Sequence, residues 1–322
     1  MRSVLSLIRL PNLLIIALTQ YAMRYFIMEP LLPSAGFELQ MDNLHFSLLV
    51  LSTVFLAAAG YIINDYFDTQ TDWINKPEKV VVGVAINRRI AMILHTVLNI
   101  IGVAIGVYLS IYIKLFSLSF IFVLTSGLLW FYSTNYKRQF LIGNLTVSFL
   151  TSLVPMIVIL FELPLLNREY GAIMLQHNTN FNYIFIWVTG FAVFAFLVTL
   201  IREIIKDAED FDGDNAYGMK TLPIKLGMTA TKIIITVLIL TAVVMLLYIL
   251  IKFIMFSSEN IDYISLVYIV GLLVLPFFIL NTMVIMADKK ADYHRASFLI
   301  KVIMLTGILY SAVVYYIINF WL

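Results

Sequence analysis

Long runs of apolar residues recur along the whole of this 322-residue chain. A helix needs about 20 mostly apolar residues to cross the hydrocarbon core of a bilayer. By that criterion the pattern predicts an all-α, polytopic membrane protein with nine transmembrane helices. The predicted helices cover residues 10–32, 44–63, 90–113, 115–131, 140–161, 183–201, 230–256, 261–286 and 298–320. Because only Lys114 separates the third helix from the fourth, we expect a tight hairpin there.

Composition supports a membrane environment and excludes an ordinary soluble domain. Hydrophobic residues make up 62% of the chain and charged residues only 12%, whereas soluble domains carry about a quarter charged residues. The chain has no cysteine, which excludes disulfides and thiolate metal sites. We therefore expect membrane lipid, and no nucleic acid, among its partners.

The distribution of Lys and Arg predicts how the chain is oriented, because cytoplasmic loops of membrane proteins carry an excess of positive charge. With the N-terminus placed inside, nearly all of the 21 basic residues fall on the inner side. The exceptions are Arg24, Lys114, Arg168 and Lys252. We therefore expect a cytoplasmic N-terminus, an external C-terminus, and outward-facing segments at 32–43 and 163–182.

Two acidic clusters stand at the inner ends of the second and sixth predicted helices, within 64–72 and 203–214. Each cluster has three aspartates spaced i, i+3 and i+7. The residues predicted to hold metal are Asn64, Asp65, Asp68 and Asp72 in the first cluster and Asp207, Asp210 and Asp214 in the second.

If the helices continue through these clusters, each trio of aspartates lies on one helix face, within about 60° of arc. Glu203 should join the face of the second trio, while Glu209 and Asp212 should point away into solvent. The two clusters then look like halves of one site.

Closely spaced carboxylates repel one another, so a cation must compensate them. Oxygen ligands in this number suit Mg²⁺, which is held by one or two carboxylates together with water and substrate phosphate. Two such faces could bind a diphosphate through bridging metal ions. The alternative is a pair of solvated helix ends, but two matched trios on the same side favour the metal site.

Basic residues near both clusters could neutralise a diphosphate as it leaves, in addition to the metal. Positive-inside topology alone explains Arg88, Arg89, Lys289 and Lys290. The residues predicted to bind diphosphate are Arg9, Asn12, Lys76, Lys79, Lys137, Arg138, Arg202, Lys206 and Lys220. Those predicted to act in catalysis are Asp68, Asp72, Asp207, Asp210, Lys137 and Tyr132, whose ring face could stabilise a carbocation. Asn144 either lines the site or joins two helices.

These motifs resemble the paired signatures of the UbiA superfamily of intramembrane prenyltransferases. The resemblance rests on Asn64-Asp65-x-x-Asp68-x-x-x-Asp72 and on Lys206-Asp207-x-x-Asp210-x-x-x-Asp214, and it extends over the whole chain. The second motif, followed by Gly218-x-Lys220-Thr221-Leu222-Pro223, is most similar to the archaeal-type branch that makes digeranylgeranylglyceryl phosphate.

The resemblance implies a single transmembrane domain over 1–322, with nine helices around a central cavity and a cytoplasmic cap formed by the motif loops. It implies an active site on the cytoplasmic side and dependence on Mg²⁺, expected as two ions for which Mn²⁺ can substitute. The partners would be a polyprenyl diphosphate donor and an acceptor, either a glycerol phosphate lipid or an aromatic ring. An apolar cavity would keep water from the carbocation.

Other functions fit these residues less well. A cation- or proton-coupled transporter would use intramembrane acids, but its site would lie near the bilayer midplane rather than among cations at the inner interface. A CDP-alcohol phosphotransferase also carries aspartates on membrane helices, but in one contiguous run that is absent here.

Overall fold

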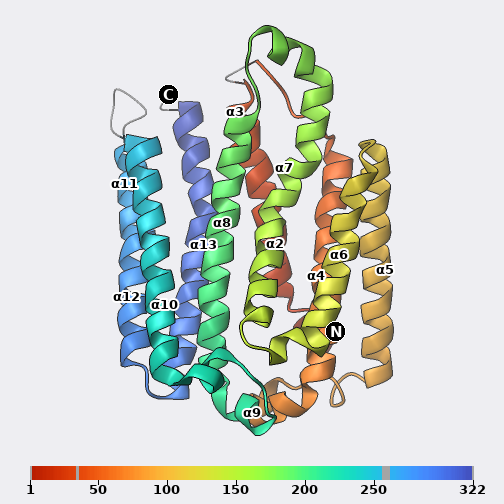
Figure 1. Ribbon diagram of the computed structural model, residues 1–322. Coiled ribbons are helices and arrows are strands. Elements are labelled where there is room, and N and C mark those ends of the chain that lie inside the picture. The colour runs from red at the N-terminus through yellow and green to blue at the C-terminus, as the bar shows by residue number, and fades with distance from the viewer. Residues whose placement is uncertain (1, 34–35, 256–261, 321–322) are drawn as a thin grey trace. The chain divides into compact units, whose positions relative to one another are not determined.

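The computed structural model describes residues 2–33, 36–255 and 262–320, and these ranges are almost entirely helical (Figure 1). Within them, β-pairing is confined to an isolated bridge between Val82 and Ile86. The chain divides into two compact units. Unit 1 comprises Met1–Lys137 and Leu153–Gly190, and unit 2 comprises Arg138–Ser152 and Phe191–Leu322. The predicted fold class is therefore confirmed as all-α.

Unit 1 is built on three helices that pack side by side in Figure 1, namely α4 (Asn43–Asn75), α5 (Arg88–Tyr112) and α6 (Ser119–Thr134). The approach of α5 to α6 requires a glycine, because a Cβ on Gly106 would lie 2.2 Å from Cγ of Phe122. The remaining elements before α7 are α1 (Arg2–Leu7), α2 (Leu10–Ala22), the π-helical turn η1 (Met23–Met28), α3 (Glu29–Leu31), and the short turns η3 (Pro77–Lys79), η4 (Phe116–Leu118) and η5 (Tyr136–Arg138).

Two long helices, α7 (Ile142–Gln176) and α8 (Asn182–Glu209), begin in one unit and end in the other. In unit 2, α12 packs against both α10 and α13. The further elements of unit 2 are α9 (Phe211–Ala216), α10 (Leu222–Ile249), η6 (Leu250–Met255), α11 (Tyr263–Ile269), η7 (Val270–Val274), α12 (Leu275–Met286) and α13 (Lys290–Phe320).

Eight helices in the described ranges are long and apolar enough to cross a membrane, against nine predicted. The difference lies in the first predicted helix, 10–32. There α2, the π-helical turn η1 and α3 follow one another without a break from Leu10 to Leu31, and the segment carries the polar Gln20, Arg24 and Glu29. The chain is an integral, multi-pass membrane protein, and the predicted hairpin at Lys114 is confirmed, since α5 ends at Tyr112 and η4 begins at Phe116.

Several helices run further than predicted. The segment 163–182, expected as an outward-facing loop, is helical as far as Gln176 because α7 continues past its two internal prolines. The end of α4 also extends, from the predicted residue 63 to Asn75. This extension places the whole first acidic cluster on a helix.

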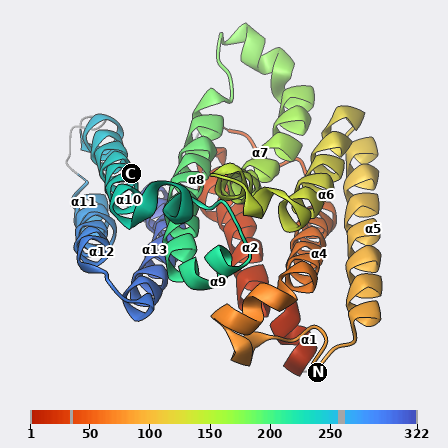
Figure 2. The same cartoon turned by 60° about the horizontal axis from the view of Figure 1, so that its bottom comes forward.

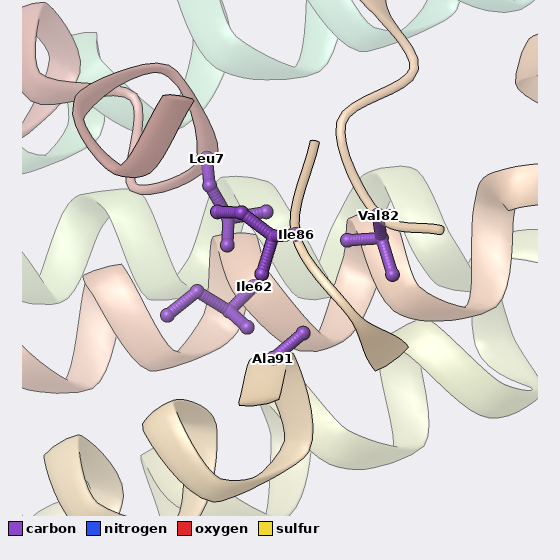
Figure 3. Close-up of a cluster of buried hydrophobic side chains, with 5 residues drawn as sticks. All are labelled: Leu7, Ile62, Val82, Ile86 and Ala91. Atoms are coloured by element: carbon purple, nitrogen blue, oxygen red, sulfur yellow. The ribbon is translucent and has the colours of Figure 1, made fainter. Parts of the chain in front are cut away.

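A small apolar cluster fixes the surroundings of that acidic cluster (Figure 3). Leu7 of α1 and Ala91 of α5 are fully buried beside Ile62 of α4, with Val82 and Ile86 from the connecting loop. Figure 2 shows α1 next to the end of α4. Since Leu7 is two residues before Arg9 and Ile62 is three residues before Asp65, this cluster holds the two polar segments together.

Candidate active site

The first acidic cluster lies on the last turns of α4, where the helix is unbroken. The expectation that helix α4 continues through Asp65, Asp68 and Asp72 is confirmed, and the i, i+3, i+7 spacing puts the three carboxylates on one face. All three residues are partly buried. Carboxylates this close and this shielded need compensating charge.

Lys137 provides part of that charge. Its ammonium group forms an ion pair with Oδ1 of Asp68 and lies 3.4 Å from Oδ1 of Asn64. The Lys137 side chain is only 9% exposed and that of Asp68 only 17%. A lysine predicted as a diphosphate ligand is therefore in contact with two predicted metal ligands.

Arg9 provides the second positive charge, and its Nη2 lies 2.7 Å from Oδ1 of Asp65. The guanidinium carbon also lies 5.0 Å from the ring centre of Tyr61, a cation–π distance. The backbone of Arg9 is left-handed, with φ 52°, a conformation that costs energy for a residue with a Cβ. Burial lowers the pKa of Arg9, but Asp65, Tyr61 and Tyr132 together outweigh this effect, so the pKa of Arg9 lies above its ordinary value.

The other predicted residues of unit 1 surround this pair of contacts. The charges of Asp65, Asp68, Arg9 and Lys76 all act on the carboxyl group of Asp72. Lys76 follows the last residue of α4, and its backbone N–H donates to the Asp72 carbonyl at 2.8 Å. Tyr132, on α6, acts on the charge of Arg9.

Two further predicted diphosphate ligands belong to the same unit. Asn12 lies in the first turn of α2, and its N–H donates to the Arg9 carbonyl at 2.8 Å. The side chain of Lys79 lies outside the described part of the structure.

The second acidic cluster differs from the first, because no single helix carries it. Helix α8 ends at Glu209, the backbone turns at Asp210 (φ −96°, ψ 11°), and Asp214 lies in the six-residue helix α9. The expected uniform face therefore does not form. Asp210 itself suits the break, because aspartate is a poor helix former in a helix interior.

Asp207 is the best-supported member of this cluster. Its Oδ2 accepts a hydrogen bond of 2.8 Å from Nδ2 of Asn144, on α7. Asp214 and Glu203 are both close enough to act on the charge of Asp207. Asn144 therefore joins α7 to α8 by a hydrogen bond, and its partner is a predicted metal ligand.

Two predicted diphosphate ligands, Arg202 and Lys206, are paired with one carboxylate. Arg202 contacts Oε1 of Glu203, and Nζ of Lys206 lies 3.1 Å from Oε2 of the same residue. Glu203 itself is buried. This acid therefore holds two cations at the end of α8.

Glu209 and Asp212 were both expected to point into solvent. Asp212 is exposed as expected, but Glu209 is buried. The Glu209 side chain is only 4% exposed, and its Oε1 lies 2.9 Å from Nδ1 of His294, on α13. Nothing in the sequence connects residues 85 positions apart, so this partner could not be predicted.

The last two predicted diphosphate ligands, Arg138 and Lys220, are joined through their backbones. The N–H of Lys220 donates to the carbonyl of Arg138 at 2.9 Å, and both residues are exposed. Their side chains are therefore available to a ligand from solvent.

The two clusters offer carboxylate and amide oxygens, the donors that Mg²⁺ prefers. In the described ranges, no group of three or more His, Asp or Glu side chains is arranged to hold a metal ion by itself. A site completed by substrate phosphate fits this arrangement better than an all-protein metal cage. The assignment of individual metal and diphosphate ligands, and the joining of both clusters into one site, stay predictions.

Sequence analysis missed a buried ion pair in unit 1, where Nη1 of Arg24 lies 3.2 Å from Oε2 of Glu162. The two side chains are 3% and 1% exposed. Glu162 also accepts the N–H groups of Gln40 and Met41. The sequence did offer a signal for this pair, because Arg24 and Glu162 are charged residues in otherwise apolar stretches.

Comparison with known proteins gives the chain its relatives. The sequence profile of the UbiA prenyltransferase family matches residues 31–317. The digeranylgeranylglyceryl phosphate synthase of Thermococcus sibiricus is 38% identical over 188 residues, which is 58% of each chain. The synthase of the same name from Korarchaeum cryptofilum is 31% identical over 253 residues, 78% of this chain and 79% of the relative. The chain thus spans less than two thirds of the length of the first of these relatives.

Solved structures share the fold. A structure concerned with the biosynthesis of digeranylgeranylglyceryl phosphate synthase in membranes has a TM-score of 0.62 and 24% identity, covering 97% of this chain and 98% of its own. A UbiA homolog from Archaeoglobus fulgidus, bound to GPP and Mg²⁺, has a TM-score of 0.59 and 15% identity, covering 97% and 99%.

Proposed function

Because the chain belongs to the UbiA prenyltransferase family, we propose that it transfers a polyprenyl group from an allylic prenyl diphosphate in a Mg²⁺-dependent reaction. The acceptor is a lipid of the geranylgeranylglyceryl phosphate type, so the product belongs to ether-lipid synthesis. The names of the relatives support this acceptor, and the GPP and Mg²⁺ bound to the Archaeoglobus homolog support the donor and the metal.

The observation that carries the proposal is the arrangement at the end of α4. Asp65 and Asp68 lie on one face, and each is in contact with a cation, Arg9 in one case and Lys137 in the other. A Mg²⁺–diphosphate complex requires oxygen ligands for the metal and positive side chains for the phosphate oxygens. This end of α4 offers both at once.

The residues of unit 1 then have separate tasks. When bound, Mg²⁺ would neutralise the charge that develops on the departing diphosphate. Asn64, Asp65, Asp68 and Asp72 hold the metal, while Lys137 turns from Asp68 to the diphosphate oxygens and stabilises their growing negative charge. Arg9 keeps Asp65 oriented and adds a second donor for the diphosphate.

In unit 2, a second set of residues is proposed to bind metal and diphosphate. Asn144 holds Asp207 in one orientation, so that the second Oδ atom of Asp207 can bind metal. Lys206 and Arg202 are held by Glu203, and Lys220 and Arg138 are exposed for the diphosphate.

Cleavage of the bond between the allylic carbon and the diphosphate leaves an allylic carbocation. The acceptor hydroxyl attacks this carbocation and loses its proton.

The distribution of basic residues supports the topology proposed with this function. The N-terminus is cytoplasmic, the C-terminus is external, and the two acidic clusters lie at the cytoplasmic surface. Since the chain has no cysteine, a single cysteine can be introduced without first removing native cysteines. Labelling of a cysteine at Gln70 by a membrane-impermeant maleimide should require opened cells, and labelling in intact cells would contradict the orientation.

The purified protein tests the reaction itself. With geranylgeranyl diphosphate, geranylgeranylglyceryl phosphate and Mg²⁺, it should release inorganic diphosphate and form a doubly prenylated lipid, detected by mass spectrometry. If a prenylated product forms with an aromatic acceptor but not with geranylgeranylglyceryl phosphate, the proposed acceptor is wrong. Absence of diphosphate release with every allylic donor would refute the proposal.

A further inference from the structure

The contact between Glu209 and His294 links α13 to the turn that carries the second acidic cluster. Glu209 is the last residue of α8, and its side chain is 4% exposed. Its Oε1 lies 2.9 Å from Nδ1 of His294, whose own side chain is 62% exposed. A buried carboxylate is strongly disfavoured unless it is paired and hydrogen-bonded, so this contact has a large influence on where the end of α8 lies.

His294 itself is held by a well-fixed helix start. The N–H groups of Asp288 and Lys289 donate to Oδ2 of Asp292, at 3.2 and 3.1 Å. Tyr293, 3% exposed, donates its hydroxyl to the Ala287 carbonyl at 3.3 Å. The imidazole therefore reaches Glu209 from a helix start that is fixed by hydrogen bonds of its own.

Glu209 is adjacent to the residues that need positioning. It follows Asp207 by two residues and immediately precedes Asp210, where the backbone leaves the helical conformation. Because α8 ends at this point, regular helix geometry does not fix the direction of Asp210 or of Asp214 in α9. A contact at Glu209 can fix it.

We propose that His294 is a positioning residue that, through Glu209, orients the turn bearing Asp210 and Asp214. This inference rests on the proposed function, in which those aspartates hold metal. Groups that orient metal ligands without touching the metal typically contribute about 10- to 100-fold to metal affinity. His294 should therefore affect the metal requirement of the enzyme more than its maximal rate.

The test compares His294→Ala, His294→Gln and Glu209→Gln in the full-length protein. Binding of Mn²⁺ is measured in the presence of inorganic pyrophosphate, and the Mg²⁺ dependence of diphosphate release is measured separately. His294→Ala should weaken Mn²⁺ binding and raise the Mg²⁺ concentration at half-maximal rate by about tenfold, with kcat changed much less. His294→Gln, which keeps a hydrogen-bond donor, should recover most of the affinity.

A matched control is available at the same helix start. Lys232 on α10 pairs with Asp288 at 3.6 Å and donates to the Ile285 carbonyl at 3.1 Å, so Lys232→Ala removes an ion pair and should leave Mn²⁺ binding unchanged. If His294→Ala lowers the thermal unfolding temperature but leaves Mn²⁺ affinity at the wild-type value, His294 only braces α13 and the inference is wrong.

A double-mutant cycle covers the case in which His294→Ala does not fold. Glu209→Gln and His294→Leu should each weaken Mn²⁺ binding, and the two losses should not add in the double variant, because the two residues act through one contact. Fully additive losses would overturn the inference. If the wild-type protein neither binds Mn²⁺ with pyrophosphate nor releases diphosphate, the proposed function itself fails, which is a distinct result.

Discussion

Lys137 and Asp68, 69 residues apart in the sequence, form an ion pair at the end of α4. The Lys137 ammonium group is therefore bound to the Asp68 carboxylate, which the proposed function assigns to metal. The same group lies 3.4 Å from the amide oxygen of Asn64. A metal ion approaching Asp68 would be repelled by the ammonium group until an anion draws that group away. Metal and diphosphate should therefore bind as a coupled pair.

The coupling predicts an unusual effect for Lys137→Met. Without diphosphate, this variant should bind Mn²⁺ more tightly than the wild type, by about tenfold, because the competing positive charge is gone. The gain in Mn²⁺ affinity that pyrophosphate brings to the wild type should shrink in the variant. Isothermal titration with and without pyrophosphate measures both effects. Lys137→Arg keeps the charge and serves as the control, and unchanged Mn²⁺ affinity in Lys137→Met would show that Lys137 does not compete with metal.

Asn144 should be required for metal affinity because it holds Asp207 by a hydrogen bond of 2.8 Å. Asn144→Ala should weaken Mn²⁺ binding about tenfold in the presence of pyrophosphate, as loss of a group that orients a metal ligand usually does. Asn99→Ala is a matched control, since it removes a hydrogen bond of 2.8 Å between Asn99 and Ser126, on α5 and α6. Equal effects of the two substitutions on Mn²⁺ affinity would reduce Asn144 to a helix–helix contact.

The buried pair of Arg24 and Glu162 should contribute to stability rather than to the reaction. Glu162→Gln leaves the Arg24 charge buried without a counter-charge, which typically costs about 3–5 kcal/mol of unfolding free energy. Thermal unfolding in detergent should show a clear decrease for Glu162→Gln.

The exposed pair of Lys232 and Asp288 gives the comparison for Arg24 and Glu162. Its Asp288 side chain is 88% exposed, and breaking such a surface pair should cost less than about 1 kcal/mol. The double variant Arg24→Met/Glu162→Leu should be more stable than Glu162→Gln, because no unpaired charge remains. Equal unfolding temperatures for Glu162→Gln and the wild type would contradict this account.

The sequence was sufficient to predict the first acidic cluster because all of its determinants are local. Asp65, Asp68 and Asp72 share a face whenever the helix is intact, and α4 contains no glycine or proline near them to break it. The long apolar helices could also be predicted from the sequence, since their length and hydropathy alone define them.

The second cluster and the buried ion pairs depended on information that local patterns do not contain. Periodicity predicted that Glu209 would face solvent, but packing against His294 of α13 buries it. The pairing of Arg24 with Glu162 depends in the same way on tertiary contacts between segments 138 residues apart. The first predicted helix has nearly the expected extent, from Leu10 to Leu31, but apolar content does not reveal the π-helical turn η1 within it.

The most direct test of the central claim is the Mg²⁺ dependence of diphosphate release by the wild type, Asp68→Asn and Asp210→Asn, with thermal unfolding confirming that each protein is folded. Release from geranylgeranyl diphosphate should require Mg²⁺, and each substitution should slow it by at least about 100-fold, since metal stabilisation of the leaving group amounts to several kcal/mol. Near-normal release by either folded variant, or release that continues after chelation of the metal, would contradict the assignment of these aspartates to a metal–diphosphate site.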